Sequence, residues 1–262
     1  ALIYTHTETL PTWTKEFTKL EFLQLESALN IPSLTSLPDG LFDDMRSLSF
    51  LQISVHQHLH QLPSFQGLMN LRYLTLALLL ELEEVPSFAS LTKLERLYIN
   101  LPLALEALPD MSPIKNLVGF VLSSGKIVCC NGFLDNKCDF TRRPCTSDPA
   151  WKYPPGVCLP VNRTDKIATA ATRSLFAKFN ASVCSLTATA SLKENQYPSE
   201  ADVNACNGTQ YRQCLRSGNR TSMCYSLRMM SIACTNDKPP TDMRKQQILQ
   251  KVNDRCDPQY EA

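Results

Sequence analysis

Few residue groupings in this sequence could do chemistry. Three of the four histidines form the cluster His56-Gln-His58-Leu-His60. On one strand the three rings would share a face and could chelate zinc or copper. The cluster instead follows a predicted strand, and the sequence puts no carboxylate beside it. We therefore expect a solvated turn and no metal site.

Acidic clusters and catalytic motifs give no stronger case for an enzyme. Asp43-Asp44 and Glu81-Leu-Glu83-Glu84 could hold calcium or a basic partner, but a solvated face is the expected arrangement. The chain lacks the Gly-x-Ser-x-Gly, His-Glu-x-x-His and phosphate-loop motifs. A paired-carboxylate glycosidase has no local signature, so it stays open as an alternative. We expect a protein that is not an enzyme and that needs no cofactor.

The elements that would position any binding residue come from a repeat in residues 1–128. The frame Leu-x-x-Leu-x-Leu, with other apolar residues at some positions, starts at Leu20, Leu48, Leu71, Leu94 and Leu117. A Leu-Pro or Val-Pro pair keeps the same period. Each frame predicts a short strand with alternate side chains buried. One repeat cannot bury its own leucines, so neighbouring repeats must stack.

This pattern resembles the leucine-rich repeat, whose period is about 20–29 residues. The resemblance implies an α/β leucine-rich-repeat solenoid with short parallel strands and an irregular convex side. About five repeats and a truncated first one fit residues 1–128, and the truncation predicts further sequence before residue 1. The family places at the end of each strand segment an Asn that bonds backbone along the stack. The corresponding positions here hold Ala28, His56, Leu79 and Pro102, so we expect irregular ascending loops.

The outward-facing strand residues are the usual binding surface of a solenoid. Three columns result: Phe22, Phe50, Tyr73 and Arg96; then Gln24, Gln52, Thr75 and Tyr98; then Glu26, Ser54, Ala77 and Asn100. Because adjacent strands lie about 4.8 Å apart, the first column predicts an aromatic ladder that ends in a guanidinium. The alternative is that these side chains only pack across strands and stabilise the sheet.

Residues 129–262 form a second predicted domain with a different composition. They hold all 11 cysteines, namely Cys129, Cys130, Cys138, Cys145, Cys158, Cys184, Cys206, Cys214, Cys224, Cys234 and Cys256. They also hold four acceptors of the type Asn-x-Ser/Thr, at Asn162, Asn180, Asn207 and Asn219. Both features are typical of an oxidising secretory route, so we expect an extracellular or cell-surface glycoprotein. An intracellular metal domain would need Cys-x-x-Cys pairs or histidines, which this half lacks.

The order of residues in this half predicts a cap followed by helices. Cys129 and Cys130 directly follow the last repeat, which indicates a disulfide-bonded cap over the open edge of the solenoid. Apolar residues recur at helical spacing over 167–183 and 223–234, and Thr241 could cap a helix that reaches residue 252. We expect a mainly helical domain with up to five intramolecular disulfides and one unpaired cysteine.

Five short segments carry a narrower resemblance. They are residues 37–45 (LPDGLFDDM), 129–134 (CCNGFL), 211–214 (YRQC), 223–225 (MCY) and 256–258 (CDP). On these the chain is similar to oomycete secreted or cell-surface leucine-rich-repeat proteins with a cysteine-rich C-terminal region of the Trp-Leu-Gly-Cys type. In that family a Trp-Leu-Gly-Cys ending follows such a Cys-Asp-Pro segment, which predicts a twelfth cysteine beyond Ala262. The resemblance implies no catalytic activity.

These observations predict an extracellular module that binds a protein or peptide partner non-covalently through the concave face. A net charge of +1 argues against binding nucleic acid by bulk charge. The longest apolar run, residues 76–80, is too short to span a membrane, although an anchor outside this segment is compatible with a surface location. The alternatives are a structural surface or scaffold protein without a specific ligand, and a glycan-active enzyme.

Overall fold

The chain forms two compact units, residues 1–190 and residues 191–262. The computed structural model describes residues 2–3, 7–27, 33–123, 126–141, 145, 156–184, 211–212, 225–226 and 249. The predicted domain boundary between residues 128 and 129 falls inside the first unit. In the second unit, β7 (Tyr211–Arg212) pairs antiparallel with β8 (Tyr225–Ser226).

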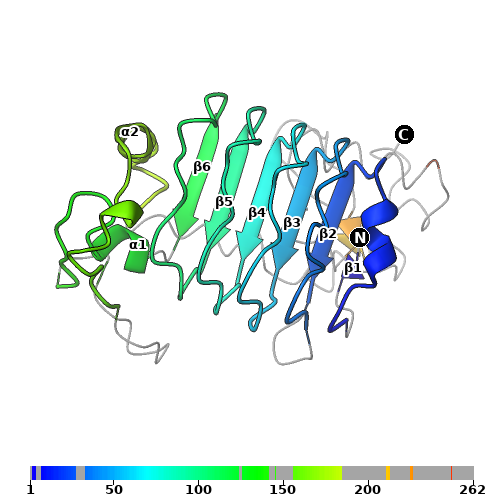
Figure 1. The fold of residues 1–262 in the computed structure, drawn as a ribbon, viewed down its shortest axis with the longest axis horizontal. Helices are drawn as coiled ribbons and strands as arrows, with labels where there is room; N and C mark the ends of the chain where they lie inside the picture. The colour runs from blue at the N-terminus through cyan, green and yellow to red at the C-terminus, as the bar shows by residue number, and fades with distance from the viewer. Residues whose placement is uncertain are drawn as a thin grey trace. The chain divides into compact units, whose positions relative to one another are not determined.

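The first unit is a parallel-strand solenoid (Figure 1). Its six strands are β1 (Leu2–Ile3), β2 (Phe22–Glu26), β3 (Phe50–Ser54), β4 (Tyr73–Ala77), β5 (Arg96–Asn100) and β6 (Gly119–Ser123). They follow chain order across the sheet, and each neighbouring pair is parallel. From β2 onward each strand begins at the third position of a predicted frame. The repeat therefore predicted both the strands and their parallel order correctly.

The leucines of the frame build the core of the solenoid. Leu51, Leu74 and Leu97 are fully buried, because alternate residues of a strand point to opposite faces. On the opposite side of each turn, Phe65 and Phe88 are also buried. Each repeat thus fills the interior from two sides, and this shared interior stacks the repeats and fixes the register of the strands.

Backbone hydrogen bonds continue one residue past the ends of three strands. Val55, Leu78 and Leu101 follow β3, β4 and β5 directly and have φ angles of 61°, 51° and 53°. The N–H group of each donates to the last carbonyl of the next strand, at 2.9, 2.9 and 3.1 Å. The left-handed conformation is costly for a residue with a branched side chain. It persists here because it satisfies an inter-repeat hydrogen bond at the same place in each turn.

A side-chain ladder joins the turns that precede the strands. Asn70 donates to the carbonyl of Arg46 at 2.7 Å, and Asn116 donates to the carbonyl of Thr92 at 2.9 Å. Between them, Lys93 donates to the Asn70 side-chain oxygen at 2.6 Å. The three side chains are 23 residues apart in sequence, so the repeat period predicts their alignment.

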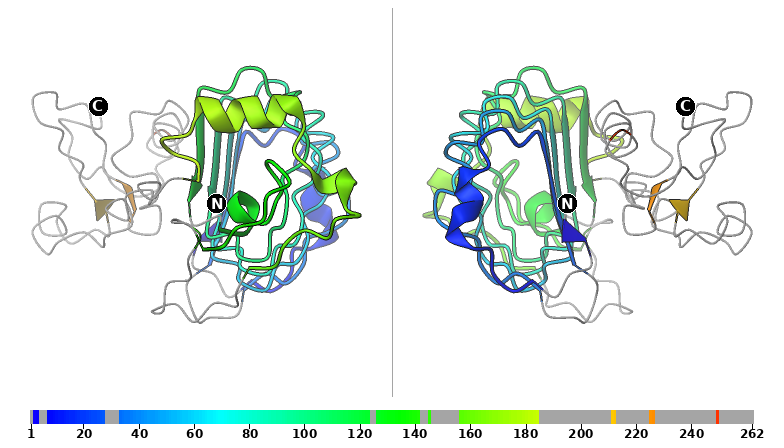
Figure 2. Two further views of the ribbon diagram at one scale, coloured as in Figure 1. Left: turned by 90° about the vertical axis from the view of Figure 1, so that its left-hand side faces the viewer. Right: turned by 90° about the vertical axis from the view of Figure 1, so that its right-hand side faces the viewer.

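A cap covers the open side of β6, with three disulfides within the cap and aromatic contacts between the cap and the strand. The cap contains α1 (Lys126–Cys130), a 3-10 turn (Thr164–Lys166) and α2 (Ala170–Lys178). The disulfides of the cap are Cys129–Cys184, Cys130–Cys145 and Cys138–Cys158. The Phe120 ring lies 5.3 Å from that of Phe176, and Leu122 bridges to Val183. Figure 2 shows α2 lying across this end of the coil. A further 3-10 turn, η1 (Thr12–Glu16), lies at the other end of the solenoid.

The described residues do not support the expectation of a mainly helical C-terminal domain. Helix α2 lies within the first predicted helical segment, 167–183. The prediction is wrong at Tyr225 and Ser226, which form a strand instead of a helix because they pair with residues 211–212. The segment 241–252 lies outside the described residues apart from Leu249. Among the helices that the structure describes, none has the length and apolar character needed to cross a membrane.

Candidate recognition surface on the parallel sheet

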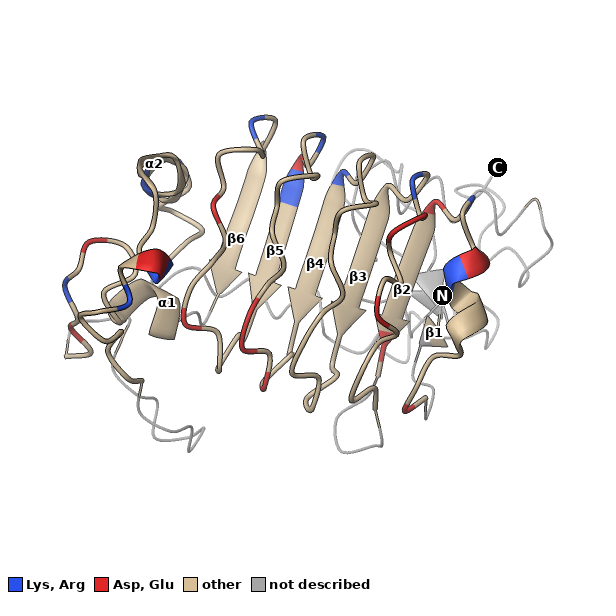
Figure 3. Cartoon of the chain, viewed as in Figure 1, with Lys and Arg blue, Asp and Glu red and all other residues tan. Residues whose placement is uncertain are grey.

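The predicted aromatic ladder forms on the outward face of the sheet. Phe22, Phe50, Tyr73 and Arg96 are paired in register across four strands. The ring centroids of Phe22 and Phe50 are 6.3 Å apart, and those of Phe50 and Tyr73 are 6.4 Å apart. The Arg96 guanidinium carbon lies 5.9 Å from the centre of the Tyr73 ring, within cation–π range. Figure 3 shows basic colour at the start of β5, the strand that begins at Arg96.

The second column runs beside the ladder in the same register. Gln24, Gln52, Thr75 and Tyr98 pair across β2 to β5, and Val121 continues the column on β6. A guanidinium nitrogen of Arg96 donates to the Tyr98 hydroxyl at 3.3 Å. This bond links the two columns and fixes the orientation of both polar groups on β5.

Exposure divides this outward face into two halves. Phe50, Gln24 and Gln52 are at most 4% exposed, whereas Tyr73, Thr75, Arg96 and Tyr98 are half-buried. The expectation of an exposed aromatic column is therefore wrong for Phe50, which has an aromatic ring on each side. Gln24 and Gln52 are buried, and their amides bond to polar neighbours on the same face. The half of the face on β4 to β6 is the more accessible one.

A buried carboxyl group lies at the end of β2, in the less accessible half of the face. Glu26 Oε2 accepts hydrogen bonds from the Gln24 amide at 2.7 Å and from the Gln52 amide at 3.3 Å. The Gln52 amide also donates to the Ser54 hydroxyl at 3.1 Å. Burial raises the pKa of Glu26 from 4.5 to about 7, and the Gln24 hydrogen bond opposes this shift. Desolvation dominates because an amide dipole compensates only part of the lost hydration.

The last strand adds two residues that the predicted columns omitted. Gly119 pairs with Arg96, and Val121 pairs with Tyr98. A methyl group on Gly119 would lie 3.6 Å from the Arg96 side chain, in ordinary contact. Extending the same frame to the copy at Leu117 would have identified both positions.

The histidine cluster differs from its prediction in two respects. His56 is 3% exposed instead of solvated, and its Nδ1 accepts a hydrogen bond from the Leu34 backbone N–H at 3.2 Å. It thus bonds the preceding repeat. Burial lowers the pKa of His56 to about 4, against a smaller opposing effect of the Leu25 carbonyl.

A carboxylate also lies near the other two histidines, contrary to expectation. Glu81 Oε1 lies 3.0 Å from His58 Nδ1, and Glu81 Oε2 lies 3.1 Å from His60 Nε2. The next repeat supplies this glutamate, which sequence proximity alone did not reveal. Across the described part of the chain, no group of three or more His, Cys, Asp or Glu side chains has a geometry that could hold a metal ion.

The remaining predicted sites lie on or near the cap. Asn162 and Asn180 are exposed, as glycan acceptors must be, while Asn207 and Asn219 lie outside the described residues. Three disulfides take six of the 11 cysteines. The other five, at positions 206, 214, 224, 234 and 256, also lie outside the described residues. Several disulfides are typical of a protein from an oxidising, extracellular compartment.

The comparison with protein families concerns the second unit. Residues 201–262 match the WLGC domain. This match agrees with the Trp-Leu-Gly-Cys type of C-terminal region that the sequence resembles. No curated protein matches the chain.

Proposed function

We propose that the chain is an extracellular recognition module that binds a protein or peptide partner through the outward face of β4 to β6. The observation that carries the proposal is the in-register group of Tyr73, Arg96 and Tyr98 on this face. Tyrosine and arginine dominate interface energetics because each combines a large apolar contact area with hydrogen bonding. The role is one of binding and not of catalysis.

The rigidity of the sheet supports this role. The backbones of β4 and β5 are each paired with a neighbouring strand on both sides, and Leu74 and Leu97 beneath them are fully buried. Arg96 is further oriented by the Tyr73 ring and the Tyr98 hydroxyl. Side chains that are ordered before binding lose little conformational entropy when a partner arrives. A flat array of fixed side chains therefore suits an extended segment of a protein.

The repeat type, the related proteins and the cellular compartment can also be inferred. We infer that the solenoid is built of leucine-rich repeats, since each frame contributes one strand and one buried turn. The WLGC match supports a relationship to the oomycete surface proteins that the sequence resembles. The disulfides support secretion.

Selection from a displayed random-peptide library tests the proposal. The full-length protein, produced by secretion, is the bait, and the enriched peptides are measured against Arg96→Ala, Tyr98→Ala and Lys115→Ala. Lys115 is exposed and precedes β6, outside the outward face, so it serves as the matched control. We expect each of the first two changes to weaken binding at least tenfold, about 1.4 kcal/mol, without effect from the third.

Two results would contradict the proposal. One is a library that yields no peptide enriched over an unrelated bait. The other is binding that survives both Arg96→Ala and Tyr98→Ala while their thermal stability equals that of the wild type. Phe50→Ala is unsuitable as a binding variant, because removing a buried ring costs about 3–5 kcal/mol of folding free energy.

A further inference from the structure

A second concave feature lies in the cap, away from the strands. It is a cavity of about 440 Å³. Its walls include Leu134, Phe176, the Cys129–Cys184 disulfide, Asp135, Arg173 and Asn180. Sites for small organic groups have volumes of about 300–1,000 Å³. The cavity is therefore large enough to accept a substantial part of a ligand.

One face of α2 forms a wall of the cavity. Phe176 and Asn180 come three and seven residues after Arg173, so the three side chains lie along one side of the helix and the turn after it. The helix is fixed to the solenoid at both ends. The Thr172 hydroxyl accepts a hydrogen bond from the Met111 N–H at 3.1 Å, and Lys178 donates to the Leu117 carbonyl at 3.0 Å. The wall is thus held by the repeats and does not depend on the cap alone.

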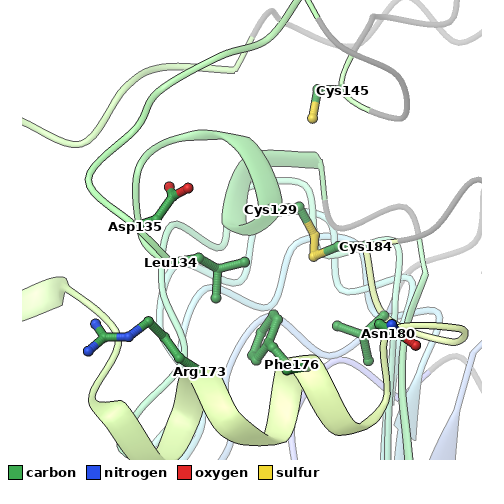
Figure 4. A pocket seen from close by; sticks show the side chains of 10 residues that line it. Cys129, Leu134, Asp135, Cys145, Arg173, Phe176, Asn180 and Cys184 are labelled. Atoms are coloured by element: carbon green, nitrogen blue, oxygen red, sulfur yellow. A yellow bond between two sulfur atoms is a disulfide. The ribbon is translucent and has the colours of Figure 1, made fainter.

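The chemistry of the walls changes along the cavity. Figure 4 shows Asp135 and Arg173 at one end, Leu134 and Phe176 in the middle, and Asn180 at the other end near the disulfide. Such an arrangement suits a group with an apolar face and polar edges. A pyranose ring has this character, because its C–H groups form a face while hydroxyl and acetamido groups project from its rim. Asp135 can accept from hydroxyls, and Arg173 can donate to a carbonyl oxygen.

Asn180 connects this cavity to a specific occupant. It begins the acceptor triplet Asn180-Ala-Ser182, it is exposed, and it is itself part of the cavity wall. We propose that Asn180 carries an N-linked glycan and that the first sugars of this glycan fill the cavity and cover the Cys129–Cys184 disulfide. Attachment makes binding intramolecular, so weak contacts are enough to keep the sugar in place. A free amphipathic ligand would have to bind without that advantage.

The covalent step needs a lipid-linked oligosaccharide of the secretory pathway as co-substrate. The amide nitrogen of Asn180 forms a bond to C1 of the first N-acetylglucosamine. The bond between C1 and the lipid diphosphate breaks, and the diphosphate leaves with the electron pair. One amide proton is released to the transferring enzyme. The inference does not rest on the proposed binding function of the sheet, since the cap and the outward face share no residue.

The experiment compares the full chain secreted from a eukaryotic host as wild type, Asn180→Gln and Asn162→Gln. Asn162 is the matched control, because it begins an exposed acceptor triplet and does not line the cavity. Glycopeptide mass spectrometry measures occupancy, thermal unfolding measures stability, and alkylation after limited thiol treatment measures the reduction rate of Cys129–Cys184. The same three proteins made in a bacterial periplasm, without N-glycans, separate the effect of the sugar from that of the amide substitution.

We expect a glycan on Asn180 in the wild type. Asn180→Gln should lower the melting temperature by about 2–4 °C and speed reduction of Cys129–Cys184 about fivefold. Asn162→Gln should change neither quantity, and the bacterial proteins should all match one another. Trimming the wild-type glycan to its first sugar should retain most of the protection.

Three results would overturn the proposal. The first is an unmodified Asn180 in the secreted wild type. The second is a disulfide that is reduced equally fast with and without the Asn180 glycan. The third is an equal difference between wild type and Asn180→Gln in the bacterial proteins, which would assign the effect to the amide and not to the sugar.

Discussion

Replacement of Glu26 should change how the stability of this protein depends on pH. Glu26 is 8% exposed, and burial raises the pKa of its carboxyl group from 4.5 to about 7. In the unfolded chain the same carboxyl ionises near 4.5. The folded state therefore holds a proton that the unfolded state releases, and stability must depend on pH between these two values.

The sign and size of the effect follow from linkage. Below pH 4.5 both states are protonated, so Glu26 contributes no pH dependence. Between pH 4.5 and pH 7 the folded state binds more protons, so its stability falls as the pH rises. Above pH 7 both states are ionised, and the loss reaches a plateau. A difference of about 2.5 pKa units corresponds to about 3 kcal/mol at that plateau.

Glu26→Gln should remove this loss and keep the local hydrogen bonds. The new amide oxygen can accept from the Gln24 and Gln52 amides as Glu26 does now. The new amide nitrogen can donate to Gln24 Oε1, a buried atom without a hydrogen-bond partner within the described residues. We expect the variant to equal the wild type near pH 4.5 and to exceed its stability by up to about 3 kcal/mol at pH 8.

Urea unfolding at pH 4.5, 5.5, 6.5 and 8 measures this difference. Glu21→Gln, which changes an exposed glutamate just before the same strand, is the matched control and should show no such trend. A Glu26→Gln variant that is no more stable than the wild type at pH 8 would refute the reasoning. So would an advantage that is equal at all four pH values, because it would come from packing and not from ionisation.

Three further predictions concern a buried histidine, a glycine and the cysteines. His56→Ala should destabilise the protein by about 1–3 kcal/mol, because the Leu34 N–H loses its acceptor. His56→Asn should retain most of that stability and, relative to the wild type, gain stability in urea unfolding as the pH falls from 6.5 to 4. Gly67→Ala should lower stability by about 1–3 kcal/mol in the same assay, because the added carbon would lie 2.0 Å from the Phe42 carbonyl oxygen. Five cysteines remain for residues 206–256. Because disulfides form between pairs of cysteines, thiol alkylation of the unfolded, unreduced chain should label an odd number of these five. Labelling at any of the six disulfide positions of the first unit would contradict the three disulfides of that unit.

The repeat made the solenoid predictable from sequence. A frame that returns after 28 residues and then every 23 requires equivalent positions to align, so the strands, their parallel order and the pairing of Tyr73 with Arg96 all follow from it. The cap was predictable only in outline. Cys129 and Cys130 indicated disulfides after the last strand, but the connectivity of a cysteine framework cannot be read from spacing alone.

The burial of the candidate surface was not predictable in this way. Periodicity assigns Phe50 and Tyr73 to the same face, yet one is buried and the other half-exposed. Alternation along a strand determines which side a residue faces and not what lies on that side. The contact between Glu81 and the two exposed histidines was missed for a different reason. His58 and Glu81 occupy equivalent positions of consecutive repeats, 23 residues apart, so alignment of the repeat frame and not proximity along the chain would have paired them.

The two buried ionisable groups oppose each other over nearly the same range of pH. As the pH rises from about 4 to 6.5, His56 makes folding more favourable, because the unfolded chain binds the proton that the buried ring excludes. From 4.5 to about 7, Glu26 makes folding less favourable. The wild-type stability should therefore change little across this interval even though each group alone has a large effect. A flat pH profile of the wild type is consequently what these two groups predict, and only the single variants, with slopes of opposite sign, can show that both contributions are present.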